Sequence, residues 1–178
     1  MKSQNLKVRL LAVVLSLMTA FSFCYAQDAG QMNELIGQSL SKLQQDPSPE
    51  AYQACIDELK GIDATYPGSV APLYNIALQC LNFSIRNPRA PQTTDFMADV
   101  DEAIRRMEEI PDADQSDLLT LKGFQYMVYI VQDPAFNGPL YYLDVMDYYA
   151  KALKLNPENQ LAKHLQEKFY EGMAQSGF

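Results

Sequence analysis

The sequence predicts an all-α protein, a right-handed array of three antiparallel helix pairs followed by a C-terminal capping helix, about seven helices in all. Three observations lead to this prediction. Apolar residues recur at helical spacing between prolines, no stretch alternates with the period of two that is typical of strands, and two stretches resemble each other 46 residues apart. Because a lone helix pair leaves its apolar faces in water, such a repeat predicts pairs that stack on their neighbours.

The repeat relates residues 70–111 to residues 116–157, in their apolar positions and in their helix breakers. In the first helix of each unit, the matching residues are Leu73, Ala77 and Leu81 against Leu119, Gly123 and Met127. In the second helix, they are Phe96, Val100 and Met107 against Tyr142, Met146 and Leu153. The breakers are Asn87-Pro88 against Asp133-Pro134, and the closing prolines are Pro111 against Pro157. Each unit is therefore expected to be a helix, a breaker, a second helix and a proline.

Prolines delimit the first four helices, because proline lacks the amide donor and restricts the residue before it. The first two are expected over residues 29–44 and 50–65, with breaks at Asp46-Pro47-Ser48-Pro49 and Tyr66-Pro67-Gly68. The third is expected over residues 70–86. A cap at Thr93 or Thr94 is expected to begin the fourth.

The fifth helix is expected from about Ser116 to Val131, and the sixth to begin at Gly138-Pro139 after a break from Asp133. Asn156-Pro157-Glu158 is typical of a helix start, with a capping side chain, a proline in the first helical position and an acid in the first turn. These elements predict one domain over residues 27–178. Its units fall at about 29–67, 70–111 and 114–157, with a cap at 157–175.

These residues resemble the tetratricopeptide repeat family, whose helix pairs carry small residues at their contact, Gly-x-x-Tyr in the first helix and a proline after the second. The matching positions are Ala77, Pro111, Gly123, Tyr126, Tyr149, Ala152 and Pro157. Units of that family have a length of about 34 residues. The units here are longer, because the links at Pro88 and Pro134 are extended. The resemblance implies a scaffold that binds peptide segments or protein helices on a concave surface, without chemistry of its own.

Residues 1–26 have the pattern of an export signal. Lys2, Lys7 and Arg9 precede an uncharged, largely apolar run, and Cys24-Tyr25-Ala26 places small residues before a cleavage point ahead of Gln27. We therefore expect a periplasmic or secreted protein with no membrane-spanning segment after cleavage. An uncleaved anchor and a lipid-modified Cys24 are the alternatives; the bulky residue at position 23 departs from lipoprotein signals.

The remaining chain is strongly acidic. Removing residues 1–26 takes away three cations and leaves 11 Lys and Arg against 22 Asp and Glu, a net charge of −11. This charge argues against nucleic acid and anionic membrane surfaces as partners. It indicates either solubility alone or a preference for basic partners.

Cys55 and Cys80 lie at nearly equal distances along the chain on either side of Pro67, which places them at similar heights on two helices that pair there. They are either a disulfide, which an oxidising compartment permits, or two small core residues. With these two cysteines and a single histidine, His164, we expect no zinc site. Asp112 to Asp117 lacks the glycine and the final glutamate of a calcium loop, and its acids fit a helix cap better.

No set of residues meets the requirements of a reaction, so we expect neither an enzyme nor a cofactor. His164 has no recognisable nucleophile or orienting acid beside it in the sequence. The acids at 99–102 and 108–109 lie mostly opposite the apolar stripe of their helix, which is typical of a solvated face.

Aromatic residues are concentrated between residues 124 and 149, where Tyr126, Tyr142 and Tyr149 fit the packing stripes. The others either pack the extended link as part of the core or form a groove as candidate partner-binding residues: Tyr129, Phe136, Tyr141 and Tyr148. The leading hypothesis is an exported, non-catalytic scaffold that binds a protein or peptide with these residues. The alternative is a small-molecule binder that stacks glycans on segment 124–149. The sequence leaves the oligomeric state open.

Overall fold

The computed structural model describes residues 28–176, and the regular structure in that range is α-helical throughout. A first helix covers residues 28–45. The others are α2 (Pro49–Thr65), α3 (Val70–Arg86), α4 (Pro91–Glu108), α5 (Gln115–Gln132), α6 (Pro134–Leu155) and α7 (Gln160–Ser176). The export signal expected in residues 1–26, including Cys24, lies outside the described residues. None of the described helices has both the length and the apolar character that crossing a bilayer requires.

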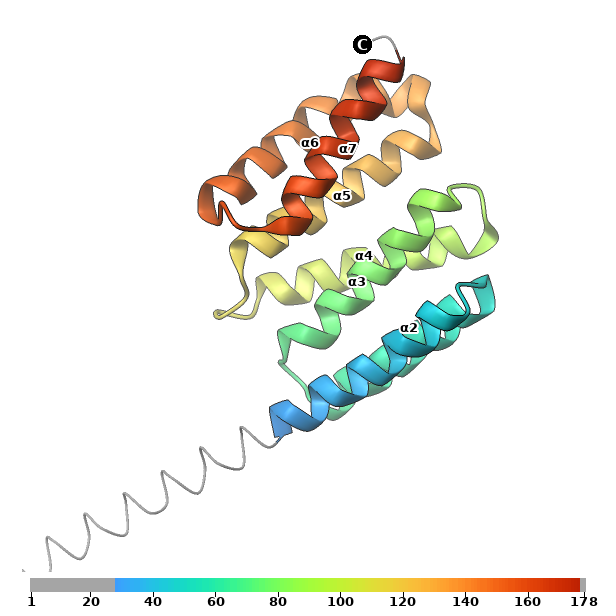
Figure 1. Ribbon diagram of the computed structural model, residues 1–178, viewed down its shortest axis with the longest axis vertical. Helices are drawn as coiled ribbons and strands as arrows, with labels where there is room; N and C mark the ends of the chain where they lie inside the picture. Colours follow the sequence, from blue (N-terminus) through green and yellow to red (C-terminus); the bar gives the residue numbers. More distant parts are fainter. Residues whose placement is uncertain (1–27, 177–178) are drawn as a thin grey trace, which may run out of the picture.

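The helices form pairs that follow one another along the long axis of the molecule, from the first helix and α2 at one end to α7 at the other (Figure 1). Helices α3 and α4 form one pair, and α5 and α6 form the next. Helix α5 also packs on α3 and α4 of the preceding pair, and α7 packs in the same way on α5 and α6. The predicted all-α array of helix pairs is therefore confirmed.

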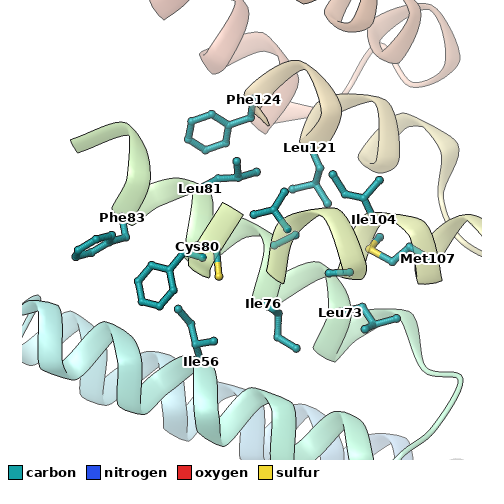
Figure 2. Close-up of a cluster of buried hydrophobic side chains, with 14 of the residues drawn as sticks. Ile56, Leu73, Ile76, Cys80, Leu81, Phe83, Ile104, Met107, Leu121 and Phe124 are labelled. Carbon is teal, nitrogen blue, oxygen red and sulfur yellow. The ribbon is translucent and has the colours of Figure 1, made fainter. Parts of the chain in front are cut away.

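One hydrophobic core runs through successive pairs. Figure 2 shows side chains of α3, among them Cys80 and Leu81, between Ile56 of α2 and the α5 residues Leu121 and Phe124. Ile56, Cys80, Leu81 and Leu121 are completely buried. Because α3 contributes side chains to both of its neighbours, neither adjacent pair can bury its apolar face without it.

The repeat-signature residues differ in environment. Ala77, Tyr149 and Ala152 are fully buried, whereas the prolines Pro111 and Pro157 lie exposed in turns. A Cβ added to Gly123 would lie 2.7 Å from Cε1 of Tyr149, so glycine is required where α5 and α6 approach each other. Tyr126, expected in the core, is instead half-buried.

The expected start of the sixth helix at Gly138-Pro139 is wrong, because α6 begins at Pro134 and contains Pro139. Asp133 alone joins α5 to α6: it ends the first helix, and its carboxylate accepts the amide N–H of Phe136 at 3.2 Å to cap the second. Pro139 removes only one intrahelical hydrogen bond near the helix start, and Gly138 before it tolerates the crowding that proline causes.

The fourth helix also begins earlier than expected, at Pro91 rather than after Thr93 or Thr94. Proline is well suited to the first position of a helix, where an amide donor is not needed. Thr93 is buried within the first turn, and its hydroxyl donates to the carbonyl oxygen of Asn87 at 2.6 Å. It therefore ties the helix to the preceding loop instead of capping it.

The predicted start of the last helix is also wrong, because α7 begins at Gln160 and its capping side chain is Asn159. The Asn159 side-chain oxygen accepts the amide N–H of Ala162 at 3.0 Å. Its amide group donates to the hydroxyl of Ser116 at 2.9 Å and to the carboxylate of Asp117 at 3.0 Å. Asn159 is buried, so these bonds hold the start of α7 on the start of α5.

Acids that were expected on a solvated face partly connect neighbouring helices. Asp99 of α4 pairs with Lys60 of α2 at 2.7 Å, and Asp101 of α4 accepts from the amide of Gln125 of α5 at 2.6 Å. On the same helix, Arg106 forms two hydrogen bonds with Asp63 of α2, at 2.6 and 2.9 Å. The contacts of Asp99 and Arg106 therefore link α4 to α2, a helix that is not consecutive with it in the chain.

Candidate functional site

A pocket of about 370 Å³ lies between α3, α5, α6 and α7. Ile85 of α3 forms one part of its wall, and the other parts come from the end of α5, the start of α6 and the second half of α7. The lining residues are Ile85, Met127, Ile130, Val131, Pro134, Gly138, Tyr142, Lys168, Phe169, Gly172 and Met173. This volume is within the range of pockets that bind small ligands or single side chains, and the lining is almost wholly apolar.

Two helical glycines enlarge this pocket. A Cβ added to Gly138 or to Gly172 would meet no atom within 4 Å, so close packing does not require glycine at either position. Glycine inside a helix costs roughly 0.5–1 kcal/mol relative to alanine. The two positions therefore give up helix stability and leave space beside the pocket, in contrast to Gly123, where the ring of Tyr149 fills the space.

Lys168 is the one charged residue in the lining of the pocket. Its ammonium group pairs with Glu171 at 2.8 Å, and both side chains are more than half exposed. The hydrogen bond to Glu171 raises the pKa of Lys168, so the lysine is charged at neutral pH. Exposed pairs of this kind are weak, which leaves the ammonium group able to exchange its partner.

Three of the four candidate partner-binding residues come together with Tyr126 in a second feature, the tyrosine cluster (Tyr126, Tyr129, Tyr141 and Tyr148). The ring of Tyr126 lies 5.9, 5.0 and 5.4 Å from those of Tyr129, Tyr141 and Tyr148, centroid to centroid. All four side chains are half-buried. The cluster is therefore neither a closed core nor a free groove, the two alternatives that the sequence left open.

An acidic residue of α4, Asp101, lies close to Tyr129 of the tyrosine cluster. Burial, followed by the nearby charge of Asp101, raises the pKa of Tyr129 to about 12. Gln125 donates to the hydroxyl oxygen of Tyr129 at 3.2 Å and to Asp101 at 2.6 Å, which links the cluster to α4. No residue of the cluster lines the pocket, and α4 contributes nothing to the pocket's lining. The two features therefore share no residue, although α5 and α6 contribute to both.

Phe136, the fourth candidate, is separate from both features. Its side chain is 70% exposed, the largest value among the exposed large hydrophobic residues described. It lies in the first turn of α6, and no aromatic ring contact is found for it among residues 28–176.

The pocket itself was not predicted from the sequence, because its residues also fit the apolar stripes of their helices. Tyr142 was assigned to the core, and it is half-buried on the pocket wall. Phe169 and Met173 are four residues apart, a spacing that fits the packing face of the last helix equally well. The available signal in the sequence was Gly172, a glycine within the last predicted helix, since Gly138 was explained by the break expected before Pro139.

Cys55 and Cys80 are free, buried thiols on the facing helices α2 and α3, so the structure contains core residues rather than the disulfide. Burial raises the pKa of Cys55 to about 11, and it raises the pKa of Cys80 as well. Thiols of raised pKa react slowly, because the thiolate is the reactive form.

The acids before α5 act as a helix cap, as predicted. The Asp114 carboxylate accepts the amide N–H of Asp117 at 3.0 Å. Among residues 28–176, no group of three or more His, Cys, Asp or Glu side chains is placed to hold a metal ion. His164 is exposed on α7.

Comparison of the chain with family models, with curated proteins and with solved structures finds no match. The array and its pocket are therefore the features that indicate a function.

Proposed function

We propose that the protein is an exported, non-catalytic scaffold of the tetratricopeptide-like kind that binds a protein or peptide. The observation that carries this proposal is the apolar pocket lined by α3, α5, α6 and α7, in which α5 contacts each of the other three helices. An apolar side chain of the partner would enter the pocket, and the adjacent helices would contact the flanking peptide.

Filling the pocket is expected to weaken peptide binding by about ten- to 100-fold. Burying one large apolar side chain is worth about 1.5–3 kcal/mol, and the partner loses that burial when the space is taken. Gly172→Leu adds a side chain at the pocket wall and improves helix propensity at the same time. The affinity of peptides selected from a random displayed library against the wild-type protein measures the effect.

The matched control is Gly61→Leu, since Gly61 lies exposed in α2, has open space for a Cβ and does not line the pocket. Equal weakening by both variants, or no weakening by Gly172→Leu, would contradict the proposed site. Calorimetric heat with an oligosaccharide panel, abolished by Tyr141→Ala but unchanged by Gly172→Leu, would favour the glycan alternative on the tyrosine cluster.

Export is proposed from the pattern of residues 1–26. We expect the mature protein to begin at Gln27, because small residues precede that position and an uncharged apolar run precedes them. The intact mass of protein recovered from the cell envelope or medium tests this. A chain that retains Met1, or one that begins at a lipid-modified Cys24, would contradict it.

A further inference from the structure

Helix α6 carries an exposed apolar stripe made of Phe136, Leu140 and Leu143. These side chains are 70%, 53% and 61% exposed. Their spacing of four and three residues places them on one face of the helix. The fully buried residues Val145, Tyr149 and Ala152 lie on the opposite face, against α5.

This stripe is concentrated compared with the rest of the described surface. Six large hydrophobic side chains are exposed among residues 28–176, and three of them are in this stripe. The other three, Val131, Leu155 and Tyr170, do not share a helix face with it. Single exposed apolar residues need no explanation, but a contiguous row of them is typical of an interaction surface.

All charged side chains in residues 133–147, the segment that contains the stripe, are acidic. Between Lys122 and Lys151 the sequence contains no Lys, Arg or His, and its ionisable acids are Asp133, Asp144 and Asp147. Asp133 caps the start of α6, Asp144 follows the stripe directly, and Asp147 lies one turn beyond Leu143. Of these three, Asp147 pairs with Lys151, at 2.6 Å. The net charge of this segment is therefore negative, and Lys151 neutralises part of it beyond Leu143.

We propose that the stripe binds an amphipathic helix of a partner protein that has a basic border around its apolar face. A row of apolar residues at i, i+4 and i+7 matches the apolar row of a second helix. Acids at both ends attract cationic side chains and repel anionic ones. A second copy of the chain fits this surface poorly. If the α6 helices of two copies paired antiparallel about Leu140, Asp147 of one copy would lie opposite Asp133 of the other, and the two carboxylates would repel each other.

This surface is independent of the proposed pocket. None of Phe136, Leu140 and Leu143 lines the pocket, and the stripe lies on the solvent face of α6. The protein would then have two docking sites, one for an apolar side chain and one for a cationic helix.

The test uses two synthetic amphipathic helices of equal length with the same leucine face, one bordered by lysine and the other by glutamate. Fluorescence anisotropy at physiological salt measures their binding to the mature protein. The triple variant Phe136→Gln, Leu140→Gln, Leu143→Gln removes the stripe and keeps both the charge and good helix formers. Leu155→Gln with Tyr170→Gln is the matched control, because it removes exposed apolar residues elsewhere.

We expect the lysine-bordered helix to bind at least tenfold more weakly to the triple variant than to the wild type, with the control pair unchanged. The glutamate-bordered helix should bind the wild type at least tenfold more weakly than its lysine counterpart. Equal binding to wild type and triple variant, equal binding of the two helices, or binding of neither would overturn the proposal. Sedimentation that shows a wild-type dimer dissociated by the triple variant would also overturn it, in favour of a second copy.

Discussion

Gly123→Val is expected to destabilise the protein by about 3 kcal/mol or more. A Cβ at this position would lie 2.7 Å from Cε1 of Tyr149, and the Tyr149 ring is completely buried, so it has no free space to move into. The Tyr149 hydroxyl also donates to the sulfur of Met127 at 2.9 Å, which holds the ring in place. The added side chain would therefore destabilise the contact between α5 and α6. Urea unfolding followed by circular dichroism measures the free energy.

Gly61→Val provides the comparison, because Gly61 is exposed in α2 with open space around it. It should change stability by no more than about 0.5 kcal/mol. In the Gly123→Val background, Tyr149→Leu removes the ring that the new side chain meets, and the two changes should couple by at least about 1 kcal/mol in a double-mutant cycle. Additive effects of the two changes would mean that the glycine is needed for another reason.

Asn159→Ala is expected to cost about 2–4 kcal/mol, because two effects add. Loss of the helix cap costs about 1 kcal/mol, and unpairing partly buried polar groups adds about 1–3 kcal/mol. The groups concerned are the Ala162 amide, the Ser116 hydroxyl and the Asp117 carboxylate. Burial raises the pKa of Asp117, while the bond from Asn159 lowers it, so the variant should raise that pKa further. Chemical unfolding gives the stability, and carbon-detected NMR titration gives the pKa.

Asn156→Ala distinguishes this account from the sequence expectation that Asn156 caps the last helix. The half-buried Asn156 side chain accepts the amide N–H of Glu158, in the exposed turn that follows, at 3.0 Å. Its replacement should cost less than about 1 kcal/mol. If Asn156→Ala were the more damaging of the two variants, the assignment of Asn159 as the buried anchor of α7 would be wrong.

The helix pairs were predictable because apolar spacing and prolines act locally. Leu73 and Leu119 occupy equivalent positions in α3 and α5, and both helices begin and end close to their expected limits. The starts of α6 and α7 were assigned to the wrong residues: α6 begins at Pro134 rather than at Gly138-Pro139, and α7 begins three residues after Pro157. For α6, the capping residue Asp133 alone is a sufficient linker after α5. For α7, the buried hydrogen bonds from Asn159 to Ser116 and Asp117 make Asn159, rather than Asn156, the capping residue.

The candidate site was predictable only in part, for a similar reason. Tyr129, Tyr141 and Tyr148 meet because α5 and α6 form a hairpin, which the sequence implies. The pocket depends on how far the second half of α7 lies from Ile85 of α3, a distance between residues that are far apart in the chain. Helical periodicity contains no information about that distance, so pocket-lining and core residues look the same in the sequence.

Because Asn159 anchors the start of α7, the tilt of this helix determines the width of the pocket at its other half. The helix is held by polar bonds at its first turn, whereas Phe169 and Met173 on the pocket wall belong to its second half. At a rise of about 1.5 Å per residue, Phe169 lies about 15 Å from the anchored end. A tilt of about 10° around that end would move this wall by roughly 2.6 Å, enough to change the size of side chain that fits.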